Sequence, residues 1–256
     1  MGSVDSAVID EGSGEHAFVL LHGLGLDSGS WQPVAEVLRS AGVRVVRPDM
    51  RAHGRVDGDS SPYVLPELAA DVIRTMDDLD VSQAHLVGHS LGGTVAAEVV
   101  LSYPSRVASV SVVDGLIAGL PASPVFVAWA EEVVGLAMQG LPELERRLPD
   151  TIMYKNRNGL RVESRLRDAA FVPASMASAY EAATAPVTSF DRFRNGEVAA
   201  PVLFIHGVED PALDLSAGEV AALVPGARGV DVADAGHLSI LEQPEAVAAA
   251  ILDGRV

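Results

Sequence analysis

The chain has 256 residues, no cysteine, and 18 Lys and Arg residues against 35 Asp and Glu residues, which gives a formal net charge of −17. This length allows one large α/β domain with an insertion, and the lack of cysteine excludes disulfides, thiolate catalysis and cysteine zinc sites. The acidity disfavours nucleic acid and anionic membranes as partners, so we expect a small neutral molecule as the ligand.

The N-terminal residues and the length of the apolar runs indicate where in the cell we expect the protein. Residues 1–6 do not form a basic segment followed by an apolar one, which is the pattern of a signal peptide. Apolar runs stay shorter than the ~18 residues that a membrane helix needs. We therefore expect a cytoplasmic protein, either a monomer or a homodimer.

Short apolar runs alternate with helix-favouring segments along most of the chain. Strands are expected at 17–21, 43–46, 84–88, 107–113, 201–207 and 229–232, and helices at 30–41, 65–79, 91–102, 214–223 and 244–252. Such alternation predicts an α/β fold with a mostly parallel, doubly wound sheet.

The alternation stops after Asp114. From Gly115 to about Asn195 the sequence contains helix-like segments separated by prolines and no convincing strand. We expect residues 115–195 to form a helical cap, inserted into a core domain made of residues 1–114 and 196–256.

The sequence Gly88-His89-Ser90-Leu91-Gly92 lies where an expected strand passes directly into an expected helix. Gly-x-Ser-x-Gly in this context predicts a nucleophile elbow, a strained turn that exposes the serine hydroxyl above the edge of the sheet. The motif alone also occurs by chance, so the interpretation depends on partners for Ser90 elsewhere in the chain.

A serine nucleophile needs a base to take its proton and an acid to orient that base. Ser90, Asp210 and His237 each follow an expected strand, and they occur in the order typical of the α/β-hydrolase fold. Asp114 is an alternative acid because it also ends a strand. Of the other histidines, we expect His22 to shape the loop after residue 21, and His53 and His89 to make local hydrogen bonds.

The chain resembles α/β-hydrolase-fold proteins of the serine esterase and lactonase type. The motifs that carry the resemblance are His22-Gly23, Asp49-x-Arg51-x-His53-Gly54, Gly88-x-Ser90-x-Gly92-Gly93, Gly207-x-x-Asp210 and Gly236-His237. The resemblance implies that the backbone N–H groups of Leu24 and Leu91 form an oxyanion hole and that residues 115–195 cover the pocket. Ala52 and Arg55 depart from the family pattern, which usually has Gly and Ser there.

These observations predict a serine hydrolase that cleaves a small or medium, neutral ester or lactone through an acyl-enzyme and needs no cofactor and no metal. One alternative is hydrolysis of a carbon–carbon bond in a diketone, but Leu238 and Leu24-Gly25-Leu26 stand where such relatives usually have Trp and Gly-Pro-Gly. Cofactor-free perhydrolase or haloperoxidase chemistry is a second alternative. A hydrolase-fold ligand receptor is the non-enzyme alternative.

Arg157, Arg161 and Arg165 recur every four residues within the expected cap. On a helix they would form one basic stripe, which could bind a substrate carboxylate. Because Glu163 and Asp168 lie among them, we favour local charge pairing and expect no role in substrate binding.

Overall fold

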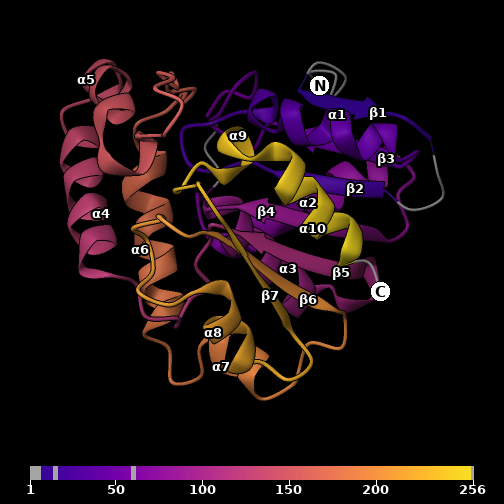
Figure 1. The fold of residues 1–256 in the computed structure, drawn as a ribbon. Helices are drawn as coiled ribbons and strands as arrows, with labels where there is room; N and C mark the ends of the chain where they lie inside the picture. The colour runs from indigo at the N-terminus through magenta and orange to yellow at the C-terminus, as the bar shows by residue number, and fades with distance from the viewer. Residues whose placement is uncertain (1–6, 14–16, 59–61, 255–256) are drawn as a thin grey trace.

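The structure is a computed structural model that describes residues 7–13, 17–58 and 62–254, so the expected absence of a signal peptide at residues 1–6 lies outside it. In the described residues, seven strands form one sheet in the order β1-β3-β2-β4-β5-β6-β7 (Figure 1). All neighbouring strands pair in parallel except β1 and β3. The strands are β1 (Val8–Glu11), β2 (Ala17–Leu21), β3 (Arg44–Pro48), β4 (Ala84–His89), β5 (Val107–Val113), β6 (Val202–Gly207) and β7 (Arg228–Val232).

Helices cover both faces of the sheet, which confirms the predicted α/β class. Alternate residues of β2 show the two faces: Phe18 and Leu20 belong to one apolar cluster, and Val19 and Leu21 belong to another. On the first face, α1 packs against α10, and on the second face α2 packs against α3. The core helices are α1 (Gln32–Ser40), α2 (Leu65–Asp78), α3 (Leu91–Ser102), α8 (Ala217–Ala222), α9 (Ser239–Glu242) and α10 (Pro244–Asp253).

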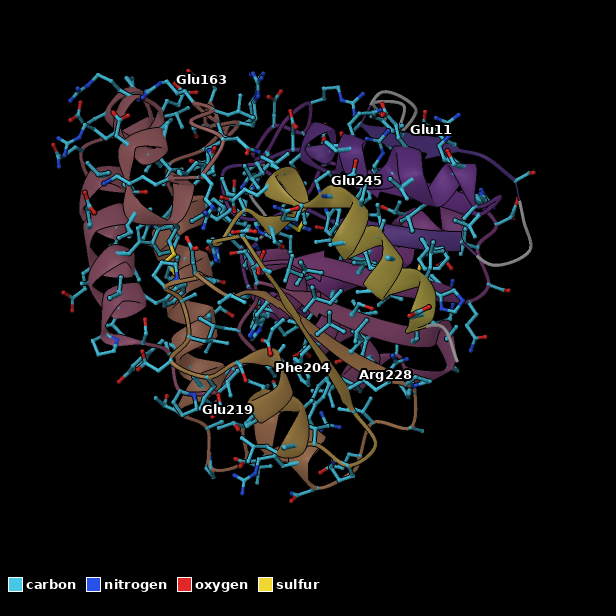
Figure 2. The ribbon with its side chains drawn as sticks, viewed as in Figure 1. Glu11, Glu163, Phe204, Glu219, Arg228 and Glu245 are labelled. Atoms are coloured by element: carbon cyan, nitrogen blue, oxygen red, sulfur yellow. The ribbon has the colours of Figure 1, made fainter. Side chains whose placement is uncertain are left out.

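Side chains divide as this layered arrangement requires. Phe204 of β6 is fully buried inside the molecule, whereas Glu219 and Glu245 lie on its outer surface (Figure 2). The edge strand β1 was not predicted. It has only four residues, which are partly exposed and do not form an apolar run. It pairs antiparallel with β3 and ends the sheet on that side.

The chain leaves the sheet after β5 and returns at β6. We refer to residues 115–195 as the cap, and its helices α4, α5 and α6 pack together beside the sheet (Figure 1). The cap contains α4 (Pro124–Ala137), α5 (Leu141–Arg147), the 3₁₀ turns η4 (Leu148–Asp150) and η5 (Ile152–Tyr154), α6 (Phe171–Ala183) and α7 (Ser189–Arg194). Within the described residues, none of the helices is long and apolar enough to cross a membrane.

Candidate active site

Ser90 stands on the sharp turn between β4 and α3. Its φ of 53° lies in the left-handed region that side chains rarely adopt, so the turn is strained. A Cβ at Gly88 would clash with the backbone of Gly92, and a Cβ at Gly92 would clash with the carbonyl of Leu21. Glycine is therefore required at both positions, and the turn lifts the Ser90 side chain above the end of the sheet.

The structure brings Ser90, His237 and Asp210 together. His237 Nε2 lies 3.0 Å from Ser90 Oγ, and His237 Nδ1 lies 3.0 Å from both carboxylate oxygens of Asp210. The side chains of His237 and Asp210 are each only 5% exposed. In this arrangement His237 can accept the serine proton while its other nitrogen donates to Asp210.

The two buried partners shift each other's pKa. Burial lowers the pKa of His237, but the charge and hydrogen bond of Asp210 outweigh it, and the net pKa is raised above 6.5. Burial likewise raises the pKa of Asp210, and the interaction with His237 brings it below its usual value. The pair therefore favours a charged Asp210 beside a histidine that binds a proton readily.

Asp114, the alternative acid, has other partners. One carboxylate oxygen accepts from the amide of Gly207 at 2.8 Å, and the other accepts from the amide of Ser239 at 3.1 Å and lies 2.5 Å from its hydroxyl. Burial and the nearby charge of Asp210 raise the pKa of Asp114. Asp114 thus joins the end of β6 to the turn that follows His237.

The loop after β2, residues 22–26, carries Leu24, and α3 begins with Leu91. We call residues 22–26 the oxyanion loop. Neither the Leu24 amide nor the Leu91 amide has a hydrogen-bond acceptor among the described residues. Both residues line the same cavity as Ser90. An oxyanion hole requires backbone N–H donors that have no other acceptor and lie beside the serine, and these two amides are candidates for that role.

Two histidines hold the loops around Ser90. His22 Nδ1 donates to the carbonyl of Gly23 at 2.9 Å, and its Nε2 accepts from the amide of Met50. His89 donates from Nε2 to the carbonyl of His237 at 2.7 Å, across 148 residues of sequence. The expected role of His22 agrees with these contacts, whereas the expectation of a local bond for His89 is wrong.

His53 also bonds beyond its neighbours. Its Nδ1 lies 3.0 Å from the carbonyl of Arg51, as a local bond requires, but its Nε2 accepts from the amide of Gly25 at 2.9 Å. Burial lowers the pKa of His53 to about 3. The ring is therefore neutral at physiological pH, which leaves Nε2 free to accept.

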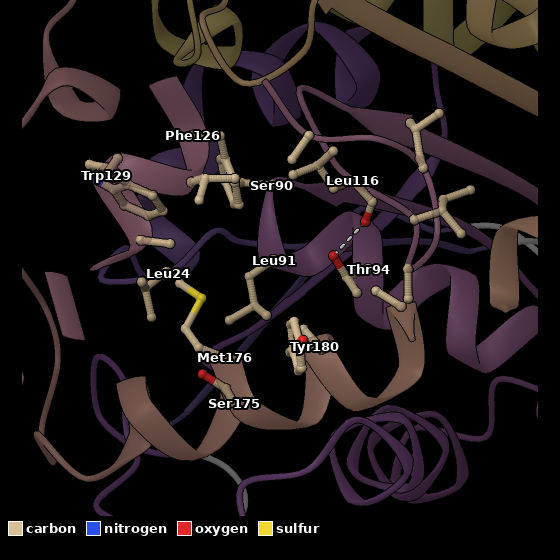
Figure 3. A pocket seen from close by; sticks show the side chains of 18 of the residues that line it. Leu24, Ser90, Leu91, Thr94, Leu116, Phe126, Trp129, Ser175, Met176 and Tyr180 are labelled. Atoms are coloured by element: carbon tan, nitrogen blue, oxygen red, sulfur yellow. Dashed lines mark hydrogen bonds between the residues drawn. The ribbon is translucent and has the colours of Figure 1, made fainter. Parts of the chain in front are cut away.

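Residues of the core and the cap enclose a cavity of about 510 Å³ above Ser90. In Figure 3, Ser90 and Leu91 lie between Phe126 and Trp129 on one side and Met176 and Tyr180 on the other. The acidic residues that line it are Asp114 and Glu131, and no Lys or Arg of the described residues lines it. The remaining lining residues are largely apolar and include Leu24, Thr94, Leu116, Ile117, Ala118, Ala130, Val134, Ala179 and Ala183.

Arg157, Arg161 and Arg165 do not lie on a helix, because residues 155–170 have no helical structure. The helical stripe is therefore wrong. The three side chains pair with separate carboxylates outside the cavity: Arg157 with Glu209 and Asp234, Arg161 with Asp150 and Glu163, and Arg165 with Asp27. Asp168, expected to join this pairing, instead accepts a hydrogen bond from Tyr63.

The two departures from the family pattern lie in the same loop, after β3. Ala52 has a φ of 60°, which explains why glycine is usual there. Arg55 donates from its side chain and its amide to the buried carboxylate of Asp49. Burial raises the pKa of Asp49, but hydrogen bonds from Arg55 and Ser28 bring it below its usual value.

Among the described residues, no group of three or more His, Asp or Glu side chains is arranged to hold a metal ion.

The comparisons with known proteins agree with this geometry. Residues 18–250 match the model of the alpha/beta hydrolase family. The chain belongs to this family. The hydrolase is 30% identical over 237 residues to 3-oxoadipate enol-lactonase 1 of Acinetobacter baylyi, covering 90% of this chain and 84% of the relative.

Two further relatives show the range of the family. A thermophilic esterase from Thermogutta terrifontis superposes on this hydrolase with a TM-score of 0.78 and 25% identity, over 96% of this chain and 91% of the esterase. A 2-hydroxy-6-oxononadienedioate/2-hydroxy-6-oxononatrienedioate hydrolase of Paraburkholderia phymatum is 29% identical over 222 residues, 82% of this chain and 76% of the relative. The chain is thus an α/β-fold hydrolase, and its relatives act on different substrates.

Proposed function

We propose that this hydrolase cleaves neutral carboxylic esters or lactones with an apolar acyl group, through an acyl-enzyme on Ser90. The observation that carries the proposal is the 3.0 Å contact between Ser90 Oγ and His237 Nε2, beneath a cavity lined mainly by apolar side chains. We further propose that residues 115–195 act as the lid of that cavity and residues 1–114 and 196–256 as the catalytic core.

In the proposed mechanism, His237 takes the proton of Ser90 as Oγ attacks the carbonyl carbon. Asp210 stabilises the imidazolium that forms. The amides of Leu24 and Leu91 donate to the negative oxygen of the tetrahedral intermediate. The intermediate collapses, the alcohol leaves with the proton from His237, and water then attacks the acyl-enzyme by the same sequence of proton transfers.

The charge of the cavity supports a neutral substrate. The names of two relatives, an oxoadipate enol-lactonase and a dienedioate hydrolase, refer to dicarboxylic acids or their derivatives. A carboxylate that enters a buried cavity needs a cationic partner. Among the described residues, no Lys or Arg lines this cavity, and the acidic residues Asp114 and Glu131 do, so we infer that an anionic acyl group is disfavoured here.

Two esters with acyl chains of five carbons test the proposal. The neutral one is p-nitrophenyl valerate, and the anionic one is the mono-p-nitrophenyl ester of glutaric acid. We expect kcat/KM to be at least 100-fold higher for valerate, about 2.8 kcal/mol. Unsubstituted γ- and δ-lactones, followed by acid release, extend the test to lactones. Equal or faster turnover of the glutarate ester contradicts the neutral acyl site, and an enzyme inert to all of these contradicts the proposed function.

A further inference from the structure

Tyr154 of the cap contacts the oxyanion loop. Its hydroxyl donates a hydrogen bond to the carbonyl oxygen of Leu24. The side chain is only 4% exposed, and burial raises the pKa of Tyr154 far above its usual value. The hydroxyl therefore keeps its proton and stays a donor at physiological pH.

This bond fixes one side of a single peptide group. The Leu24–Gly25 peptide presents its carbonyl to Tyr154, and its N–H donates to His53 Nε2 at 2.9 Å. A peptide group is planar and rigid. With a cap residue on one edge and a core residue on the other, it cannot rotate without breaking a buried hydrogen bond.

The preceding peptide group, Gly23–Leu24, is held at its carbonyl. The oxygen of Gly23 accepts from His22 Nδ1 at 2.9 Å and from the amide of Leu26 at 3.1 Å. The Leu24 amide is then the one polar group of these two peptides without a partner among the described residues. The network leaves that single donor without a partner, in a residue that lines the cavity of Ser90.

Gly25 allows the cap to approach this closely. Its φ is +68°, and a Cβ there would clash with the Tyr154 hydroxyl and lie 2.7 Å from a methyl group of Leu148. The carbonyl of Gly25 also accepts from the amide of Arg165 at 2.8 Å. Three cap residues thus contact the oxyanion loop at a residue without a side chain.

We propose that Tyr154 is a positioning residue that aims the Leu24 amide at the oxyanion and so makes the rate of catalysis depend on contact between the cap and the oxyanion loop. The inference rests on the proposed function for the role of that amide. A donor whose position is fixed in advance stabilises the transition state more than the bound substrate. Loss of the tyrosine hydroxyl should therefore lower kcat and leave KM nearly unchanged.

Tyr154→Phe removes the hydroxyl and keeps the ring. The matched control is Tyr63→Phe, because Tyr63 is also buried and also joins core to cap, with a 2.6 Å hydrogen bond to Asp168 that does not involve the oxyanion loop. Both variants are assayed for kcat and KM on p-nitrophenyl valerate. They are also assayed for the rate at which a fluorophosphonate labels Ser90. Rates are expressed per labelled serine at the end point, so only folded molecules count.

For Tyr154→Phe we expect kcat and the labelling rate each to fall about tenfold, which is less than the 10²–10³ lost with a whole oxyanion donor. KM and the pH midpoint should stay within twofold and 0.3 units of the parent. For Tyr63→Phe we expect both rates within twofold. The proposal is overturned by a Tyr154→Phe labelling rate within twofold of the parent, by a loss confined to KM, or by an equal loss in Tyr63→Phe. If the parent hydrolyses no ester, the labelling rates still decide the role of Tyr154, while the proposed function fails separately.

Discussion

Asp210 and Asp114 follow neighbouring strands of the sheet, yet only Asp210 places its carboxylate against His237 Nδ1, with both oxygens at 3.0 Å. The carboxylate oxygens of Asp114 instead accept hydrogen bonds from the amides of Gly207 and Ser239. The hydrogen bonds thus give the two aspartates different roles. Asp210 orients the histidine, and Asp114 links two loops.

This division predicts different costs for removing each negative charge. Asp210→Asn leaves His237 in the wrong tautomer and should lower kcat by about 10⁴, as the equivalent change does in the serine-protease triad. Asp114→Asn keeps the size of a side chain whose raised pKa already favours the neutral form, and should cost less than tenfold. Steady-state kinetics of the two variants measure both values. A larger loss at Asp114 would exchange the two roles.

The raised pKa of His237 predicts the pH dependence of activity. A base must be unprotonated, so kcat/KM should rise with pH and reach half its maximum above pH 6.5. In Asp210→Asn the largest contribution that raises this pKa is gone and the effect of burial remains, so the midpoint of the residual activity should move to a lower pH than in the parent. The profiles of both proteins, recorded on the same ester, test this sign. A midpoint that stays in place or moves upward would show that Asp210 does not set it.

Small side chains on the cap helices α4 and α6 predict how long an acyl chain the cavity accepts. Ala130 of α4 and Ala179 of α6 both line the cavity. Ala179→Leu should fill part of it, and should lower kcat/KM for p-nitrophenyl octanoate at least tenfold more than for the acetate. Ala128→Leu is the control, because Ala128 lies on the exposed face of α4. Parallel losses for both esters would remove Ala179 from the acyl site.

The pairing of Arg161 with Asp150 and Glu163, outside the cavity, predicts that it has no role in substrate charge selection. Arg161→Gln should change kcat/KM for the valerate and glutarate esters by similar factors of less than threefold. A selective loss of tenfold or more for the glutarate ester would instead assign a substrate carboxylate to this arginine.

The fully buried strands could be predicted because burial on both faces leaves a run of apolar residues in the sequence. β2 and β6 are buried at every position, so β2 appears as an uninterrupted apolar run and β6 begins with one at residues 202–205. The turns that follow them carry Leu24 and Asp210, so the location of the site followed from the strands and from the elbow at Ser90. The half-exposed edge strand β1 has no such run and was missed.

Contacts between distant segments could not be predicted in the same way. The four-residue spacing of Arg157, Arg161 and Arg165 suggested a helix, but Gly159 interrupts it, and the charges pair with different loops instead. Tyr154 shows the same limit. It contacts Leu24 across 130 residues, and nothing in its local sequence indicates that partner.

The most direct test of the account is the identity of the nucleophile. A fluorophosphonate, added to the full chain and followed by peptide mass spectrometry, should label Ser90 and no other residue, and ester hydrolysis should stop as labelling completes. Ser90→Ala should keep the melting temperature of the parent within a few degrees, because the elbow accepts a small side chain, and should show neither labelling nor turnover above the uncatalysed rate. Labelling or turnover that persists in Ser90→Ala would contradict the account.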